Sequence, residues 1–87
     1  MKKILMFTMK SCPYCVMAHR WMKELLEEHP EFKEIEIKIV DELEQPAYAD
    51  KFDYYYVPTY YVGGVKVHEG VPTKEIIEGV YEKAYNG

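Results

Sequence analysis

The segment Lys10–Leu26, KSCPYCVMAHRWMKELL, places two cysteines two residues apart at the start of a predicted amphipathic helix. Pro13 stands where a first helical residue stands, and its missing N–H costs nothing there. From Cys15 onward apolar residues recur at helical spacing, and Pro30 ends the pattern. The apolar stripe consists of Cys15, Ala18, Met22, Leu25 and Leu26, with Trp21 beside it. The chain has no other cysteine, so the pair must be weighed as a metal site, a crosslink or a redox centre.

Strands are predicted on both sides of this helix. Ile4–Phe7 is a continuous apolar run, which suits a strand buried on both faces. Glu34–Val40, EIEIKIV, alternates strictly and predicts a half-exposed edge strand with Ile35, Ile37 and Ile39 on one face. Because a helix joins the two strands, we expect them to be parallel, with a right-handed crossover.

The second half of the chain predicts a short helix around Ala47–Phe52, followed by a hairpin. The hairpin strands are Val57–Val62 and Val65–His68, and the Gly63-Gly64 pair between them is a two-residue turn signal. Thr73 can cap a last helix. This helix is expected to bury Ile76, Ile77, Val80 and Tyr81. The predicted order, β-α-β-α-β-β-α, is an α/β arrangement with a mixed sheet, and we expect residues 1–87 to form a single domain.

Composition excludes several classes of function. The net charge is −4, the acidic residues are scattered and no basic face is visible, which argues against a nucleic-acid partner. Lys10 ends the apolar run of the first residues, MKKILMFTMK, and no cleavage site follows it. No stretch approaches the ~20 apolar residues of a membrane span. We therefore expect a cytoplasmic protein, where a close cysteine pair is more often catalytic or metal-binding than structural.

A metal site is not favoured by the spacing. A closed zinc site needs more ligands than two cysteines supply. His19 lies one turn after Cys15, but Cys12 and His19 are about 10 Å apart along a helix, too far to share one ion. His68 could contribute only through a tertiary approach. A structural crosslink is not favoured either, because a bridge over two residues closes a very small loop and stabilises little.

Redox chemistry fits the position of the pair. Cys12 is expected at the helix N-terminus, where unpaired N–H groups and the positive end of the dipole favour a thiolate. Lys10 adds a nearby positive charge. Cys12 is therefore the expected nucleophile, and the more shielded Cys15 is expected to resolve the mixed disulfide. Pro13 and Tyr14 set the stiffness and the electrostatics between the two sulfurs.

The sequence resembles the thioredoxin-like superfamily over essentially its whole length. FTMKSCPYC resembles the active site of glutaredoxins, whereas VDELEQPAYADKFDYYYVPT has the spacing of thioredoxins, and GVPTKEII resembles the family's glycine before its last helix. The resemblance implies a thioredoxin fold, with a four-stranded mixed sheet and helices on both faces. It further implies a cis Pro58 against the CPYC loop, with Val57 offering its backbone to an extended substrate. Thr59 follows that proline, and Gly70 is expected to form a further wall of the substrate groove.

This chain departs from both branches of the family. Glutaredoxins usually carry Lys or Arg three residues before the first cysteine, where this chain has Met9. They also carry a Ser-Asp or Asp-Asp pair after the Gly-Gly, and here VKVHEG follows instead. Thioredoxins usually have Trp before the first cysteine, where this chain has Ser11, and Gly-Pro inside the motif, where it has Pro13-Tyr14. The sequence thus leaves the reductant open between glutathione and a thioredoxin-reductase-type protein.

The resemblance implies a monomeric enzyme that exchanges dithiol for disulfide with protein substrates and holds no cofactor. Two alternatives stay open. One is an iron–sulfur or metal-binding glutaredoxin-like protein, although the proline of CPYC stiffens the loop. The other is a non-catalytic module that binds a peptide through a tyrosine-rich groove. Tyr54, Tyr55 and Tyr56 precede the expected cis-proline, and we expect one or two of them near the groove rim.

Overall fold

The fold is built on a four-stranded mixed sheet, seen in a computed structural model that describes residues 1–87. The strands are β1 (Ile4–Thr8), β2 (Ile37–Asp41), β3 (Thr59–Val62) and β4 (Val65–Glu69). Their spatial order is β2-β1-β3-β4. As expected, β1 and β2 pair in parallel and β3 and β4 form an antiparallel hairpin. β1 and β3 are also antiparallel, so β1 is a central strand.

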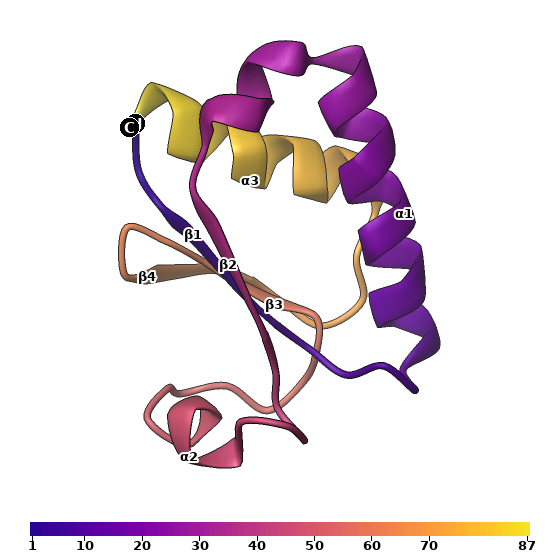
Figure 1. The fold of residues 1–87 in the computed structure, drawn as a ribbon, viewed down its shortest axis with the longest axis vertical. Coiled ribbons are helices and arrows are strands. Elements are labelled where there is room, and N and C mark those ends of the chain that lie inside the picture. The colour runs from indigo at the N-terminus through magenta and orange to yellow at the C-terminus, as the bar shows by residue number, and fades with distance from the viewer.

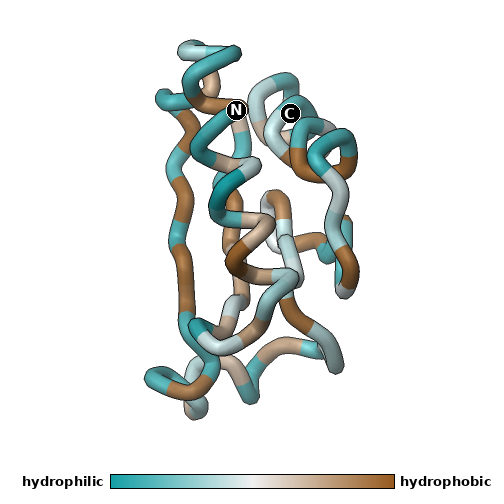
Figure 2. Tube along the Cα trace, turned by 90° about the vertical axis from the view of Figure 1, so that its right-hand side faces the viewer, coloured by the Kyte–Doolittle hydropathy of each residue, from teal (hydrophilic) through white to brown (hydrophobic).

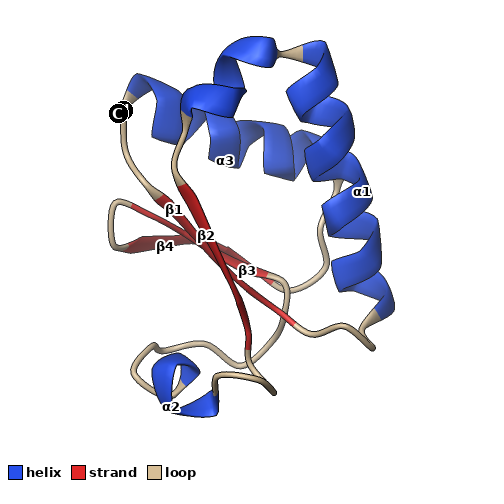
Figure 3. Ribbon diagram, viewed as in Figure 1, coloured by secondary structure: helices blue, strands red, loops and turns tan.

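Helices cover both faces of this sheet (Figures 1 and 3). Helices α1 (Pro13–Glu28) and α3 (Lys74–Asn86) pack together on one side, and the short α2 (Pro46–Ala49) lies on the other. A 3₁₀ helix, η1 (Pro30–Glu34), follows α1 directly and was not predicted. The predicted α/β class, with a mixed sheet between helices, is confirmed. No helix has the length and apolar character that crossing a membrane requires.

Two hydrophobic clusters occupy the two sides of the sheet. The larger cluster lies between the sheet, α1, η1 and α3; it consists of Ile4, Met6, Ala18, Met22, Leu25, Phe32, Ile35, Tyr60, Val62, Ile77, Val80, Tyr81 and Ala84. Trp21 packs against it, half-buried. The smaller cluster, on the α2 side, consists of Phe7, Val40, Ala49 and Tyr61. Tyr60 and Tyr61 thus face opposite sides of β3, as strand alternation predicts.

The chain ends lie side by side (Figure 2). The N-terminal ammonium of Met1 donates a hydrogen bond to the Gly87 carbonyl at 2.7 Å. Lys2 N–H donates to the Ala84 carbonyl at 2.7 Å, so the residues before β1 are tied to the last turn of α3.

Several predicted boundaries were wrong for identifiable reasons. The second strand begins at Ile37 rather than Glu34, because the chain first makes η1. The third strand begins at Thr59 rather than Val57, because Pro58 has no N–H to donate to a ladder. The short helix opens at Pro46 and ends at Ala49, whereas a helix over Ala47–Phe52 was predicted.

The single-face pattern predicted for Ile35, Ile37 and Ile39 holds only in part. Ile35 is buried and Ile37 half-buried, but Ile39 is 47% exposed. Ile39 lines an open pocket between β2 and α1 instead of lying under a helix. The fully buried residue at this end of β2 is Val40, which faces the smaller cluster.

The last helix is capped as predicted, but its buried stripe is shifted. The Thr73 hydroxyl accepts a hydrogen bond from Ile76 N–H at 3.1 Å. The side chains that face the sheet are those of Ile77, Val80, Tyr81 and Ala84. Ile76, which was predicted to be buried, is 36% exposed, because it lies about 100° around the helix from Ile77.

The neighbouring isoleucines of α3 give a matched test of this packing. Ile77 is fully buried, so Ile77→Ala should lower the free energy of unfolding by about 2–5 kcal/mol. Ile76→Ala should cost less than about 1 kcal/mol, as an exposed position does. Urea unfolding followed by circular dichroism measures both values. Equal losses from the two variants would show that the helix faces are assigned wrongly.

Candidate active site

Cys12 lies at the junction between β1 and α1. It is the N-cap residue of α1, in an extended conformation, and Pro13 is the first helical residue. Cys12 N–H donates to the Met9 carbonyl at 3.1 Å, and the Cys12 carbonyl accepts from Val16 N–H at 3.1 Å. No side chain caps the helix, so the first-turn N–H groups remain free beside the half-exposed sulfur of Cys12.

Cys15 lies one turn further along α1 and is 1% exposed. Both cysteines are free thiols. Burial raises the pKa of the Cys15 thiol above its ordinary value, and the neighbouring Cys12 acts in the same direction. Hydrogen bonds from the Thr8 hydroxyl and the Met9 backbone lower the pKa of Cys15 and partly offset that burial. The pair therefore consists of one accessible sulfur and one buried sulfur.

The loop before β3 lies against the Cys12 sulfur. The Val57–Pro58 peptide bond is cis, as the family resemblance implies. The Cys12 thiol donates a long hydrogen bond to the Val57 carbonyl, with a sulfur–oxygen distance of 3.9 Å. Gly70 N–H donates to the Pro58 carbonyl at 3.0 Å, so the residues after β4 join the same site. Gly70 has a φ of +97°, a backbone conformation that side chains rarely adopt.

Thr59 and Lys10 are placed differently from the other candidate residues. Thr59 is fully buried, and its hydroxyl donates back to the Tyr56 carbonyl, so it shapes the loop rather than facing the groove. Lys10 forms an ion pair with Glu44, at an Nζ–Oε2 distance of 2.7 Å. The contact of the Lys10 ammonium is therefore a carboxylate, not the Cys12 sulfur.

A shallow apolar groove of about 310 Å³ runs beside Cys12. We call it the Tyr14 groove; it is lined by Tyr14, Tyr56, Val57, Gly70 and Val71. Tyr56 is 69% exposed at its rim. Tyr54 behaves differently, because its ring stacks on Phe7 at a centroid distance of 4.7 Å. Of the three consecutive tyrosines only Tyr56 lines the groove, which agrees with the predicted one or two, and Tyr55 is 84% exposed outside it.

Glu69 is a site residue that the sequence did not indicate. It ends β4, and its carboxylate accepts hydrogen bonds from the backbone N–H groups of Tyr55 and Tyr56, the latter at 3.0 Å. It also pairs with Lys66, at 2.7 Å. These contacts join residues far apart in sequence, so no local motif reveals them. They hold the loop that leads into Val57 and Pro58.

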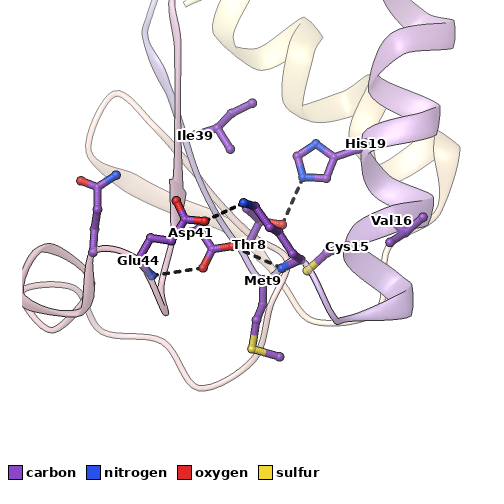
Figure 4. Close-up of a pocket in the computed structure, with 10 residues that line it drawn as sticks. Thr8, Met9, Cys15, Val16, His19, Ile39, Asp41 and Glu44 are labelled. Atoms are coloured by element: carbon purple, nitrogen blue, oxygen red, sulfur yellow. Dashed lines mark hydrogen bonds and ion pairs between the residues drawn. The ribbon is translucent and has the colours of Figure 1, made fainter.

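Thr8 and His19 are two further residues beside the cysteines. Thr8 Oγ1 and His19 Nε2 lie 3.1 Å apart, in a hydrogen bond that links the end of β1 to α1. Figure 4 shows His19 and Cys15 both pointing from α1 toward Thr8. The sequence places His19 one helical turn after Cys15 but indicates no partner for it. No group of three or more His, Cys, Asp or Glu side chains is arranged to hold a metal ion.

Glu69 should make the stability of the protein depend on acid pH. Its hydrogen bonds, first from Lys66 and then from the Tyr55 and Tyr56 amides, lower its pKa from 4.5 to about 2. A carboxyl with a lowered pKa stabilises the folded state above its ordinary pKa, and the effect disappears as pH falls toward the folded-state value. We therefore expect the melting temperature to fall between pH 4.5 and about 2, and this fall to be smaller in Glu69→Gln.

Thermal melts over that pH range test this expectation. Glu27→Gln, on the exposed face of α1, is the matched control and should keep the wild-type pH profile. Identical profiles for Glu69→Gln and the wild-type protein would show that Glu69 does not secure this loop.

Known proteins of one family match this chain along nearly its whole length. The model of the thioredoxin domain family matches residues 2–82. A thioredoxin from Methanocaldococcus jannaschii is 32% identical over 81 residues, which is 93% of this chain and 93% of that protein.

Two solved structures illustrate the likeness in fold. Oxidised thioredoxin from Plasmodium falciparum superposes with a TM-score of 0.71 at 20% identity, covering 94% of this chain and 79% of that chain. Glutaredoxin 1 from Francisella tularensis covers 100% of both chains at 20% identity, with a TM-score of 0.51. The strand order, the helices on both faces and the extent of the family match agree: the chain belongs to the thioredoxin domain family.

Proposed function

We propose that this protein is a thiol–disulfide oxidoreductase that reduces disulfides of protein substrates through Cys12 and Cys15. The observation that carries the proposal is the asymmetry of the pair. The Cys12 sulfur is accessible at an uncapped helix start and faces the Val57 carbonyl, whereas Cys15 is 1% exposed one turn behind it. An accessible sulfur can attack a substrate disulfide, and a shielded neighbour can resolve the mixed disulfide.

The reaction consists of two exchanges. The Cys12 thiolate attacks one sulfur of the substrate disulfide, and the other substrate sulfur leaves as a thiolate. Cys15 then attacks the Cys12 sulfur, which breaks the mixed disulfide and releases the second substrate thiolate. Each thiolate takes a proton from water. The cysteine pair is oxidised by two electrons and the substrate disulfide is reduced by the same two.

The Tyr14 groove supports an extended polypeptide as substrate. The Val57 backbone borders the groove beside Cys12 and can pair with a chain laid along it, as an added strand does. Tyr14, Tyr56 and Val71 offer mainly apolar contact area. We propose substrate segments with apolar residues next to the cysteine.

We further propose a thioredoxin-reductase-type protein as the reductant. The relative that is 32% identical over nearly the whole chain is a thioredoxin. Met9 and the segment VKVHEG stand where glutaredoxins carry residues that recognise glutathione. CPYC itself resembles glutaredoxins, so glutathione as co-substrate is the competing proposal.

Substitution of Cys12 and substitution of Cys15 should block different steps of the reaction. Cys12→Ser should lose disulfide reduction entirely, because no other accessible thiol exists. Cys15→Ser should still attack and should accumulate mixed disulfides with substrates, because the resolving thiol is gone. Mass spectrometry of the protein after incubation with a disulfide substrate distinguishes the two. Full activity of Cys12→Ser would refute the mechanism.

NADPH consumption should identify the reductant. The protein is supplied with a test disulfide and coupled in parallel to thioredoxin reductase and to glutathione with glutathione reductase. We expect turnover with thioredoxin reductase, and Cys12→Ser serves as the control in both assays. Turnover with glutathione alone would assign the protein to the competing proposal.

A further inference from the structure

In the second exchange, Cys15 must lose a proton before it attacks, because the thiolate is the nucleophile. This proton needs an acceptor. Burial raises the pKa of this thiol, so only a small fraction is ionised at neutral pH without help. The thiol is 1% exposed and lines a pocket at the end of β1. A group that accepts its proton must therefore lie on that side of the pair.

Two polar side chains, those of Thr8 and His19, lie beside Cys15. Thr8, Cys15 and His19 line the same pocket, and Thr8 Oγ1 lies 3.1 Å from His19 Nε2. His19 follows Cys15 by one helical turn, so both side chains project from the same face of α1 onto Thr8 (Figure 4). The central strand β1 fixes Thr8 between them.

His19 also has access to solvent. It lines a pocket of about 440 Å³ that opens between α1 and the ends of β1 and β2. Partial burial lowers the pKa of His19 below its ordinary value of 6.5. The imidazole is therefore uncharged at neutral pH and can accept a proton. A proton that reaches the imidazole can therefore pass on to water in the pocket.

The other ionisable groups facing this site are already engaged. Lys10 and Glu44 pair with each other at 2.7 Å. The Asp41 carboxylate accepts the backbone N–H groups of Lys10, Leu43 and Glu44. From β3, Tyr60 is buried and donates its hydroxyl to Met22 Sδ, and burial raises its pKa, so it keeps its proton. Cys12 is held in the mixed disulfide at this stage.

We infer that His19 accepts the proton of Cys15 during resolution. The proton reaches His19 through the Thr8 hydroxyl, so His19 acts on Cys15 indirectly. This inference rests on the proposed function. The Cys15 S–H proton passes to Thr8 Oγ1 as the Thr8 hydroxyl proton passes to His19 Nε2. The Cys15 thiolate forms a bond to the Cys12 sulfur, and the substrate thiolate leaves with the electron pair. The imidazolium then releases its proton to water, and His19 returns to the neutral form.

The aromatic disulfide dithionitrobenzoate (DTNB) separates the two exchanges. Reduced protein mixed with DTNB releases one coloured thiolate when Cys12 attacks and a second when Cys15 resolves. The first rate depends on DTNB concentration and the second does not. His19→Ala should leave the first phase unchanged and slow the second by about 100-fold at neutral pH, in the range of general-base effects. Added imidazole should restore the second phase, because the pocket is open.

The pH profile and the variants of Thr8 complete the test. In the wild-type protein the second phase should rise as His19 loses its proton, below pH 6.5, and then level off. In His19→Ala it should instead follow ionisation of the Cys15 thiol at higher pH. Thr8→Val should slow the second phase as His19→Ala does, and Thr8→Ser, which keeps the hydroxyl, should not. His29→Gln, at the far end of α1, is the matched control.

These experiments distinguish failure of the proposed dithiol cycle from failure of the proposed role of His19. A wild-type protein without a second phase, or a Cys15→Ser protein that retains it, would refute the proposed dithiol cycle itself. A biphasic wild-type reaction with an unchanged second phase and pH profile in His19→Ala would overturn only the role of His19.

Discussion

The position of β1 in the centre of the sheet is the constraint on which the rest of the molecule depends. β1 pairs with β2 on one side and β3 on the other, and its side chains are buried on both faces. Met6 packs in the larger cluster and Phe7 in the smaller one. A strand held in this way has little freedom to shift its register, because a one-residue slip would exchange the two buried faces. The end of β1 is therefore a fixed point, and α1 starts from it.

The two cysteines acquire different environments from this single junction. Cys12 stands before the first helical turn, outside the packed layer, and Cys15 stands inside it. The two sulfurs differ in exposure because two residues separate them across the start of α1. No further structural element is needed to bury one and expose the other. The same junction sets Thr8 against Cys15 and His19, because β1 and α1 meet there.

The elements of the fold could be predicted because their signals are local. Helical spacing after Cys15, alternation near Ile37 and the Gly63-Gly64 turn are each visible in a short window. The 3₁₀ helix after Pro30 was missed because it belongs to a connection without periodicity. The misassignment of Ile76 has a different origin: it and Ile77 are equally apolar, and only the direction of α3 over the sheet decides which one is buried.

The site was predictable to the extent that it lies within motifs. Cys12, Cys15 and the Val57-Pro58 pair are recognisable from their neighbours in sequence. Glu69, Thr8 and His19 are not, because their contacts depend on distances across the sheet or between strand and helix. A threonine at the end of a strand and a histidine on a helix are common, and only the folded chain brings them within 3.1 Å of each other.

The strand order leaves β2 and β4 with one unpaired edge each. Such edges can recruit a strand from another molecule and start aggregation. Charged side chains on both strands oppose this: Lys38 and Asp41 on β2, and Lys66 and Glu69 on β4. An incoming strand would have to accommodate these charges. The long edges of the sheet therefore resist self-association, which favours a protein that remains monodisperse when concentrated.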